Sequence, residues 1–268
     1  MKIAWLTDLH LNFLDRNSRK RFYEFVSITK ADLIMISGDI AEAPSVKEIL
    51  IEMERELNRP IYFVLGNHDY YFGDVQEVRD EMTQLTNTEP LLYWLPAIKP
   101  IALKKMIYLI GQDGWADGRY GDYYHSPVAV NDSRLIIDLF LQQGLGKKQL
   151  LKQMRQLADT DALQLKNKLH EAVDLGAKQI LVITHVPPFK ENCFYRGKEG
   201  TRDFLPYYAS QATGNVLLEL AHEYQQIHFS VFCGHTHAKS IYKPLTNLTI
   251  KSGQAEYYMP DIQEIITI

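Results

Sequence analysis

Five short clusters in this sequence carry the side chains most suited to metal chemistry. They are Asp8-Leu9-His10, Gly38-Asp39, Gly66-Asn67-His68-Asp69, Thr184-His185 and Gly234-His235-Thr236-His237. Their carboxylate oxygens, imidazole nitrogens and amide oxygen suit Mn, Fe, Zn, Ni or Co better than Ca or Cu(I). None of the clusters contains a cysteine, which argues against a structural zinc site with thiolate ligands.

The number of these side chains indicates two metal ions rather than one. The candidate ligands are Asp8, His10, Asp39, Asn67, His185, His235 and His237. This set is too large for one tetrahedral ion, but it suits two divalent or trivalent ions that share a bridging carboxylate. Two ions about 3.5–4 Å apart form a clamp for displacement at phosphorus and generate hydroxide from bound water near neutral pH. The sequence therefore favours hydrolysis of a phosphate ester by a metal-bound hydroxide.

His68 is the candidate acid for the leaving oxygen because it lies next to the predicted ligand Asn67. We expect the Asp69 carboxylate to hydrogen-bond the His68 ring and to hold its orientation. Taken singly, such residues also have ordinary structural roles, such as a helix cap for Asp8 or Asp39. Their combination after predicted strands favours the functional interpretation.

An apolar run precedes each cluster and is predicted to be a buried strand. The runs cover residues 3–7, 32–37, 61–65, 179–184 and 228–233. Runs of this length that are apolar on both faces are typical of parallel strands. In an open α/β sheet the ligand crevice lies at the carboxyl ends of the strands, so all five clusters are expected to meet at one edge.

Helices are predicted between several of these strands. Ser45 with Glu48, and Asp74 with Glu77, are candidate capping boxes that open helices to about residue 58 and residue 85. Alternating strands and helices indicate βαβ units and a largely parallel sheet. Candidate hairpins at 98–110 and 241–251 make the sheets mixed, as expected for two stacked sheets.

Two long segments interrupt this pattern. Residues 111–132 are rich in Gly, Asp and Tyr and are predicted to be a loop, and helical sequence follows to residue 175 with a break near Gly144 and Gly146. We interpret 112–175 as a cap insertion within one domain that covers 1–268. Residues 186–213 form a second long loop. Loops of this length are usually functional or disordered.

Both loops are predicted to select the substrate, because loops at a ligand-bearing edge are the nearest protein surface. The candidate substrate-binding residues are Trp115 and Arg119 in the first loop and Arg196 in the second, with Asp113 also near the mouth. An aromatic ring stacks on a planar group, and an arginine pairs with a phosphate oxygen. The alternative is that these loops pack on themselves at the surface.

The composition narrows the range of binding partners expected for this protein. The chain has 268 residues and a net charge of −4, which does not favour a broad nucleic-acid-binding surface. No apolar stretch has the length of a membrane span, and the N-terminus does not resemble a signal peptide. With only two cysteines, a soluble cytoplasmic protein that acts on a small phosphate ester is expected. Nothing in the sequence specifies an oligomeric state.

The five clusters, in this order, resemble the signature of the calcineurin-like metallophosphoesterases over residues 8–237. The resemblance implies an α/β fold, an αββα sandwich of two mixed β-sheets flanked by helices. It implies that Asp8, His10 and His237 bind one metal ion and that Asn67, His185 and His235 bind the other. Asp39 would bridge the two ions, and His68 would act as the acid or stabilise the transition state.

Two departures narrow the resemblance. Protein Ser/Thr phosphatases of this superfamily continue the second block as Asp-Arg-Gly and end the third block in Glu, whereas this chain has Gly38-Asp39-Ile40 and Asn67-His68-Asp69. Lipid-A-type diphosphate hydrolases carry Arg in place of His68. The sequence is more similar to the Asn-His-Asp branch, so a phosphodiesterase is favoured over a protein phosphatase. A nuclease of the same superfamily and a non-catalytic metal-binding scaffold remain as alternatives.

Overall fold

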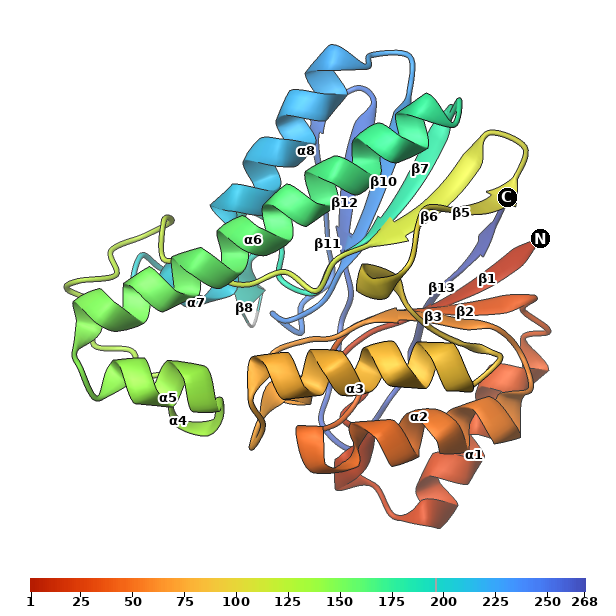
Figure 1. The fold of residues 1–268 in the computed structure, drawn as a ribbon, viewed down its shortest axis with the longest axis horizontal. Helices are drawn as coiled ribbons and strands as arrows, with labels where there is room; N and C mark the ends of the chain where they lie inside the picture. The colour runs from red at the N-terminus through yellow and green to blue at the C-terminus, as the bar shows by residue number, and fades with distance from the viewer. Residues whose placement is uncertain (196) are drawn as a thin grey trace.

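The computed structural model describes residues 1–195 and 197–268 and shows two stacked β-sheets between layers of helices (Figure 1). The first sheet contains, in spatial order, β13 (Ile262–Thr267), β1 (Lys2–Leu6), β2 (Leu33–Ser37), β3 (Ile61–Val64) and β4 (Leu92–Trp94). The second contains β11 (Ser240–Leu245), β12 (Leu248–Ser252), β10 (His228–Cys233), β7 (Gln179–Ile183), β6 (Ile107–Gly111) and β5 (Ile101–Lys104).

Both sheets are mixed, which confirms the predicted αββα sandwich. Strands β1 to β4 pair in parallel, and β13 pairs with β1 antiparallel. In the second sheet β6, β7, β10 and β12 are parallel, while β5 and β11 are antiparallel edge strands. The five predicted strands agree with the observed ones to within one residue at each end, and both predicted hairpins form.

Long helices cover the outer faces of the two sheets (Figure 1). The first sheet is covered by α1 (Arg16–Ile28), α2 (Ala43–Leu57) and α3 (Val75–Thr88), and the second by α6 (Lys147–Asp174) and α8 (Gln211–Glu223). The short elements are α4 (Asp132–Leu135), α5 (Ile137–Gln143), α7 (Leu205–Tyr208), the hairpin β8 (Phe194–Tyr195) with β9 (Lys198–Glu199), and 3-10 turns at Leu11–Phe13, His68–Tyr70, Leu95–Ala97 and Lys190–Asn192. Among the described helices, none has both the length and the apolar character needed to cross a membrane.

The two sheets enclose an apolar core that fixes their relative position. Trp5 and Met35 of the first sheet pack with Ile183 and Phe232 of the second. The Trp5 and Phe232 rings meet edge to face with centroids 5.0 Å apart, and the Trp5 indole N–H donates to Ser37 Oγ at 2.9 Å. Each such buried side chain contributes about 1.5–3 kcal/mol. This packing therefore holds the carboxyl ends of the strands in fixed relative positions.

One of the two predicted capping boxes is wrong. Asp74 caps α3 as expected, because its carboxylate accepts the N–H groups of Gln76 and Glu77 at 2.9 and 3.1 Å. Ser45 does not cap α2, which already begins at Ala43 after Glu42. Pro44 lies in the first turn, where its fixed φ is already helical, so the helix starts before Ser45.

The segment 112–175 divides into two structural parts. Its middle, with α4, α5 and the first turns of α6, extends beyond the sheets (Figure 1). The C-terminal half of α6 instead buries Leu165, Leu169 and Ala172 in the core over the second sheet, beside α8. That half of α6 is a layer helix of the sandwich. The interpretation of the whole segment as a cap insertion stays a prediction.

Candidate metal centre

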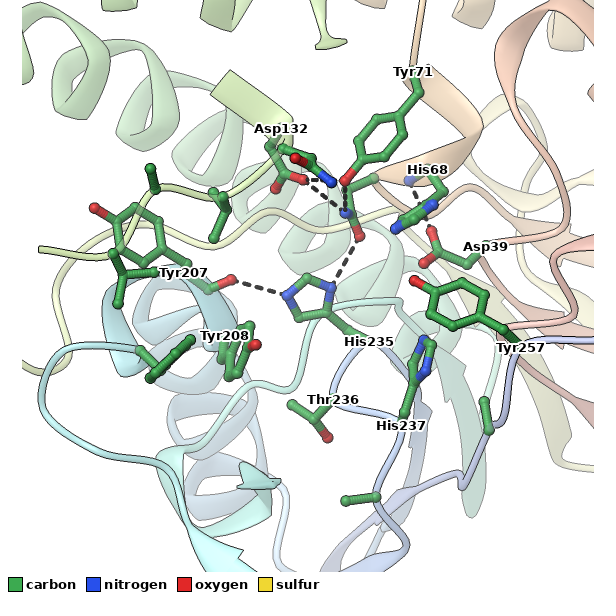
Figure 2. Close-up of a pocket in the computed structure, with 18 of the residues that line it drawn as sticks. Asp39, His68, Tyr71, Asp132, Tyr207, Tyr208, His235, Thr236, His237 and Tyr257 are labelled. Carbon is green, nitrogen blue, oxygen red and sulfur yellow. Dashed lines mark hydrogen bonds between the residues drawn. The ribbon is translucent and has the colours of Figure 1, made fainter. Parts of the chain in front are cut away.

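All seven candidate ligands converge at one edge of the sandwich. Four of them, Asp39, Asn67, His235 and His237, line a pocket of about 750 Å³ (Figure 2). Each ligand follows the carboxyl end of a strand: Asp8 and His10 follow β1, Asp39 follows β2, Asn67 follows β3, His185 follows β7, and His235 and His237 follow β10. The strands come from both sheets, so the edge joins the two halves of the sandwich.

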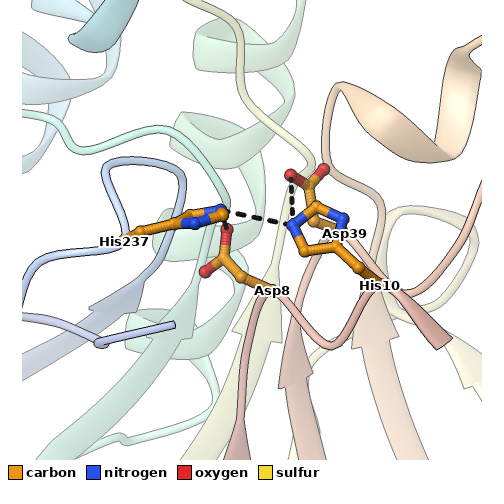
Figure 3. A group of neighbouring side chains, drawn as sticks. All are labelled: Asp8, His10, Asp39 and His237. Atoms are coloured by element: carbon orange, nitrogen blue, oxygen red, sulfur yellow. Dashed lines mark hydrogen bonds and ion pairs between the residues drawn. The ribbon is translucent and has the colours of Figure 1, made fainter. Parts of the chain in front are cut away.

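Asp8, His10, Asp39 and His237 form the first ligand group (Figure 3). Their candidate ligand atoms all lie within 4.8 Å of one another. Nε2 of His10 lies 3.2 Å from Nε2 of His237, and the latter atom lies 3.4 Å from Oδ1 of Asp8. Two imidazole nitrogens that face each other between carboxylates form a donor set that fits a transition-metal ion.

Asn67, His185 and His235 form the second ligand group. The Asn67 amide oxygen lies 3.0 Å from His185 Nε2 and 2.9 Å from His235 Nδ1. The other nitrogen of each ring faces a backbone carbonyl, Ser37 O at 2.8 Å for His185 and Tyr207 O at 2.9 Å for His235. Such carbonyls accept the ring N–H and leave the inward nitrogen to bind a metal ion.

Asp39 lies between the two groups. Its Oδ2 atom is 3.7 Å from His10 Nε2, and its Oδ1 atom is 3.3 Å from His185 Nε2. Oδ1 also accepts the His68 backbone N–H at 2.9 Å, which helps to fix the carboxylate. One carboxylate that presents an oxygen to each group has the position expected of a bridging ligand.

The electrostatic environment keeps the two candidate ligand carboxylates, Asp8 and Asp39, ionised, because both have lowered pKa values. Burial alone would raise the pKa of Asp8, but the hydrogen bond and charge of His237 lower it to about 2. Burial lowers the pKa of His10 to about 4, which favours the neutral imidazole that binds metals. Burial would also lower the pKa of His185, yet the Asp39 carboxylate raises it to about 10. Metal binding at His185 would therefore release a proton.

Backbone strain is concentrated at the ligand-bearing turns. Asp8, His10, Asp39, His235 and His237 all have left-handed backbones, with φ between 43° and 70°. Each such conformation costs a non-glycine residue about 1–3 kcal/mol and is typical of functional sites. The packing is also tight, because a Cβ at Gly66 would lie 2.2 Å from Asp39 Oδ1.

His68 borders the pocket beside the ligands, as the sequence predicts. Its ring centroid lies 4.6 Å from that of His10 and 4.2 Å from that of Tyr71. The buried Nδ1 atom has no hydrogen-bond partner among the residues that the structure describes. The position suits a proton donor to a bound ester, and that role stays a prediction.

Asp69 does not orient the His68 ring, contrary to the expectation from the sequence. Its carboxylate is fully buried and accepts the backbone N–H groups of Ile40, Ala41 and Gly66 at 2.8–2.9 Å. Side chains of adjacent residues in a helical turn do not face each other, so Asp69 points away from His68. Asp69 instead ties together the turns after β2 and β3, which carry Asp39 and Asn67.

The expected substrate-binding residues of the first loop do not line the pocket. Trp115 is only 4% exposed and packs on Tyr70 with ring centroids 4.9 Å apart. Arg119 pairs with Asp117 at 2.9 Å and with Asp159 at 2.8 Å, outside the pocket lining. Burial of apolar surface draws the indole inward. Arg196, the candidate from the second loop, lies outside the described residues.

Asp113 was also expected near the mouth, and it is fully buried beneath the site. Its carboxylate accepts the Leu65 N–H at 2.8 Å and the Tyr70 hydroxyl at 2.6 Å. Its carbonyl accepts the His185 N–H at 2.7 Å. Asp113 therefore connects the end of β3 with the end of β7 and holds two ligand-bearing turns in place.

Sequence reasoning missed several residues that border the pocket. They include Tyr71, Asp132, Tyr207, Tyr208 and Tyr257 (Figure 2). These residues stand apart from the five clusters in sequence, and tyrosine is common in ordinary cores and surfaces. Of these residues, only Asp132 could have been suspected from the sequence, because it lies between a predicted loop and a predicted helix. The same position is equally typical of an ordinary helix terminus.

Asp132 connects the 112–175 segment with the second ligand group. One of its oxygens accepts the Asn67 Nδ2–H at 2.8 Å and the Tyr71 hydroxyl at 2.8 Å. Because this bond holds the amide nitrogen of Asn67, the amide oxygen faces His185 and His235. Asp132 is therefore a positioning residue for a candidate ligand.

Replacing Asp132 by alanine is expected to weaken metal binding at the second group by about 10–100-fold, the usual cost of losing an outer partner of a ligand. D132N keeps an acceptor oxygen and should recover part of this loss. The measurement is Mn(II) binding to metal-free protein by titration calorimetry. D138A is the matched control. The Asp138 carboxylate accepts the Val75 N–H at 2.9 Å, and Asp138 does not line the pocket. Wild-type affinity for both ions in D132A would contradict the positioning role.

Two curated proteins match parts of the chain. A metallophosphoesterase from Campylobacter jejuni, named as uncharacterized, is 33% identical over 101 residues, which cover 34% of this chain and 25% of that protein. A transmembrane protein with a metallophosphoesterase domain from Danio rerio is 32% identical over 82 residues, which cover 28% of this chain and 18% of that protein. The matches thus span a quarter or less of the length of these relatives.

Two solved structures share the fold over nearly the whole chain. Phosphopantetheinyl hydrolase from Mycobacterium tuberculosis aligns with a TM-score of 0.62 at 11% identity, covering 96% of this chain and 90% of that one. A dimetal phosphatase from Danio rerio aligns with a TM-score of 0.58 at 11% identity, covering 95% and 87%. At this identity the likeness establishes the fold alone.

The family model described as calcineurin-like phosphoesterase matches residues 1–239. This stretch contains all five clusters, from Asp8 to His237. The structure places the candidate ligands of those clusters at one edge, in the fold that the similar structures share. The chain therefore belongs to the calcineurin-like phosphoesterase family.

Proposed function

We propose that this protein hydrolyses a phosphodiester or a small phosphomonoester at a centre of two metal ions. Membership of the family supports a metal-dependent hydrolase of phosphate esters. The position of Asp39 carries the finer proposal, because its two oxygens face different ligand groups, one with His10 and one with His185. A carboxylate placed in this way would bind both ions, one through each oxygen.

The residues present fit such a centre. Asp8, His10, Asp39 and His237 would hold the first ion, and Asp39, Asn67, His185 and His235 would hold the second. Carboxylate, imidazole and amide donors suit Mn, Fe, Zn or Ni. When bound, such ions act as Lewis acids toward phosphoryl oxygens and lower the pKa of water.

The chain supplies a proton donor beside this centre. His68 lies at the pocket wall next to His10 and donates a proton to the leaving oxygen of the ester. The backbone N–H of His68 meanwhile holds Asp39. The same turn thus carries the candidate ligand Asn67 and the candidate acid His68, whose backbone N–H also holds the Asp39 carboxylate in place.

The size and lining of the pocket support a small substrate. A volume of about 750 Å³ lies within the usual range for small-molecule sites, about 300–1,000 Å³. Val128 and Val130 of the first loop and Tyr207 and Tyr208 of the second line the pocket. These stretches therefore take the substrate-selecting role that the sequence gave to other residues of the two loops. The Asn67-His68-Asp69 block favours a phosphodiesterase over a protein phosphatase.

The test is a substrate panel on metal-free protein reconstituted with Mn(II). Bis-(p-nitrophenyl) phosphate and p-nitrophenyl phosphate represent small diesters and monoesters, and single-stranded and duplex DNA represent polymers. We expect the protein to hydrolyse a small ester. A chelator should abolish this turnover, and added Mn(II) should restore it. Faster cleavage of DNA would favour the nuclease alternative. No turnover with Mn, Fe, Zn or Ni bound at both groups would favour a non-catalytic scaffold.

A further inference from the structure

The segment that joins β12 to β13 passes along the ligand-bearing edge. It covers residues 253–261 and crosses from the second sheet to the first. Ala255 N–H donates to His237 O at 3.4 Å, and Gln254 exchanges two hydrogen bonds of 2.8 Å with the Gln263 side chain. This segment lies beyond residues 1–239, the stretch that the family model matches.

Tyr257 lies in this segment and borders the pocket. Its ring centroid is 4.6 Å from that of His10, 5.2 Å from that of His237 and 6.3 Å from that of His68. The side chain thus lies against two candidate ligands of the first group and near the candidate acid. It is 41% exposed, so a bound molecule can reach it.

The Tyr257 ring also packs against Phe13. The two rings meet edge to face with centroids 5.6 Å apart. Aromatic pairs of this geometry contribute about 0.5–1.5 kcal/mol beyond their burial. Figure 2 shows the hydroxyl end of the ring directed toward the middle of the pocket. None of the described residues forms a hydrogen bond with this hydroxyl in the structure.

We propose that Tyr257 is a further catalytic residue, whose hydroxyl donates a hydrogen bond to a phosphoryl oxygen of the ester bound at the metal centre. The inference rests on the proposed function. Negative charge is spread over the phosphoryl oxygens during transfer, and a preorganised donor stabilises it. Asp8 and Asp39 can only accept hydrogen bonds when ionised, so a neutral phenol contributes a donor that these neighbours lack. The Tyr257 proton stays on its oxygen throughout.

The direct test compares Y257F with wild type in the Mn(II)-loaded protein. We expect kcat on the better p-nitrophenyl ester to fall about 10–100-fold, somewhat less than the loss of a fully enclosed oxyanion donor. Binding of inorganic phosphate, measured by titration calorimetry, should weaken about tenfold, while elemental analysis shows the wild-type metal content. Y258F is the matched control, because Tyr258 is 66% exposed and does not line the pocket, and it should match wild type.

Y257L separates the hydroxyl from the ring, and it should resemble Y257F if the hydroxyl acts. The inference would be overturned if Y257F kept the wild-type kcat and phosphate affinity, or if only Y257L showed a defect. It would also be overturned if Y257F lost metal, or if the wild-type protein did not bind phosphate. If wild type binds phosphate through Tyr257 but hydrolyses no ester, the proposed function fails and the phosphate contact stands.

Discussion

Replacing Asp39 by alanine is expected to lower kcat by about 10³-fold or more and to reduce metal binding at both ligand groups. Asp39 is the residue whose carboxylate faces both groups, with Oδ2 toward His10 and Oδ1 toward His185. A metal centre contributes several kcal/mol to stabilising charge at phosphorus, and each tenfold in rate corresponds to about 1.4 kcal/mol. Substitution of any other ligand should affect mainly one ion.

The measurement combines elemental analysis with kinetics on the best ester of the panel. D39N is the sharper variant, because its amide oxygen still accepts the His68 N–H while the negative charge is lost. D74A controls for a lost carboxylate elsewhere, since Asp74 caps α3 at the surface, and it should keep both ions and full kcat. Two ions bound with wild-type affinity in D39N would show that the bridge is misassigned.

Replacing His68 by alanine is expected to lower kcat by about 10²–10⁴-fold on a diester with an alkyl leaving group, the usual range for general acid catalysis. The loss on a p-nitrophenyl ester should be much smaller, because p-nitrophenolate departs without protonation. Both ions should remain bound, because His68 belongs to neither ligand group. The measurement is kcat on the two leaving groups with metal content determined in parallel.

H125A is the matched control, because the His125 side chain is 86% exposed and lies outside the pocket. It should retain wild-type rates on both esters. Equal losses of H68A on the alkyl and p-nitrophenyl esters would contradict the acid role. A loss of one ion in H68A would instead make His68 a ligand.

The sandwich fold and the convergence of the candidate ligands at one edge were predictable because both follow from local patterns. Buried parallel strands appear as short apolar runs, and the residue after each run must lie at the carboxyl edge of its sheet. Asp8, Asp39, Asn67, His185 and His235 all stand within three residues of a strand end. Their convergence therefore required no knowledge of side-chain direction.

The errors arise where side-chain direction decides the role. Asp69 follows His68 directly, but the 3-10 turn aims it at backbone N–H groups. Trp115 lies in a loop rich in polar residues, and its indole nevertheless packs into the core. Tyr257 reaches the pocket only because β13 pairs with β1 and draws residues 253–261 across the edge. Such long-range pairing leaves no signal near the residue itself.

The most direct test of the central claim is anomalous diffraction from crystals of the Mn(II)-loaded protein. The account predicts two manganese peaks about 3.5–4 Å apart. Asp39 should lie between them, with Asp8, His10 and His237 on one ion and Asn67, His185 and His235 on the other. A single peak at saturating Mn(II), or two peaks of which only one contacts Asp39, would contradict the dinuclear centre.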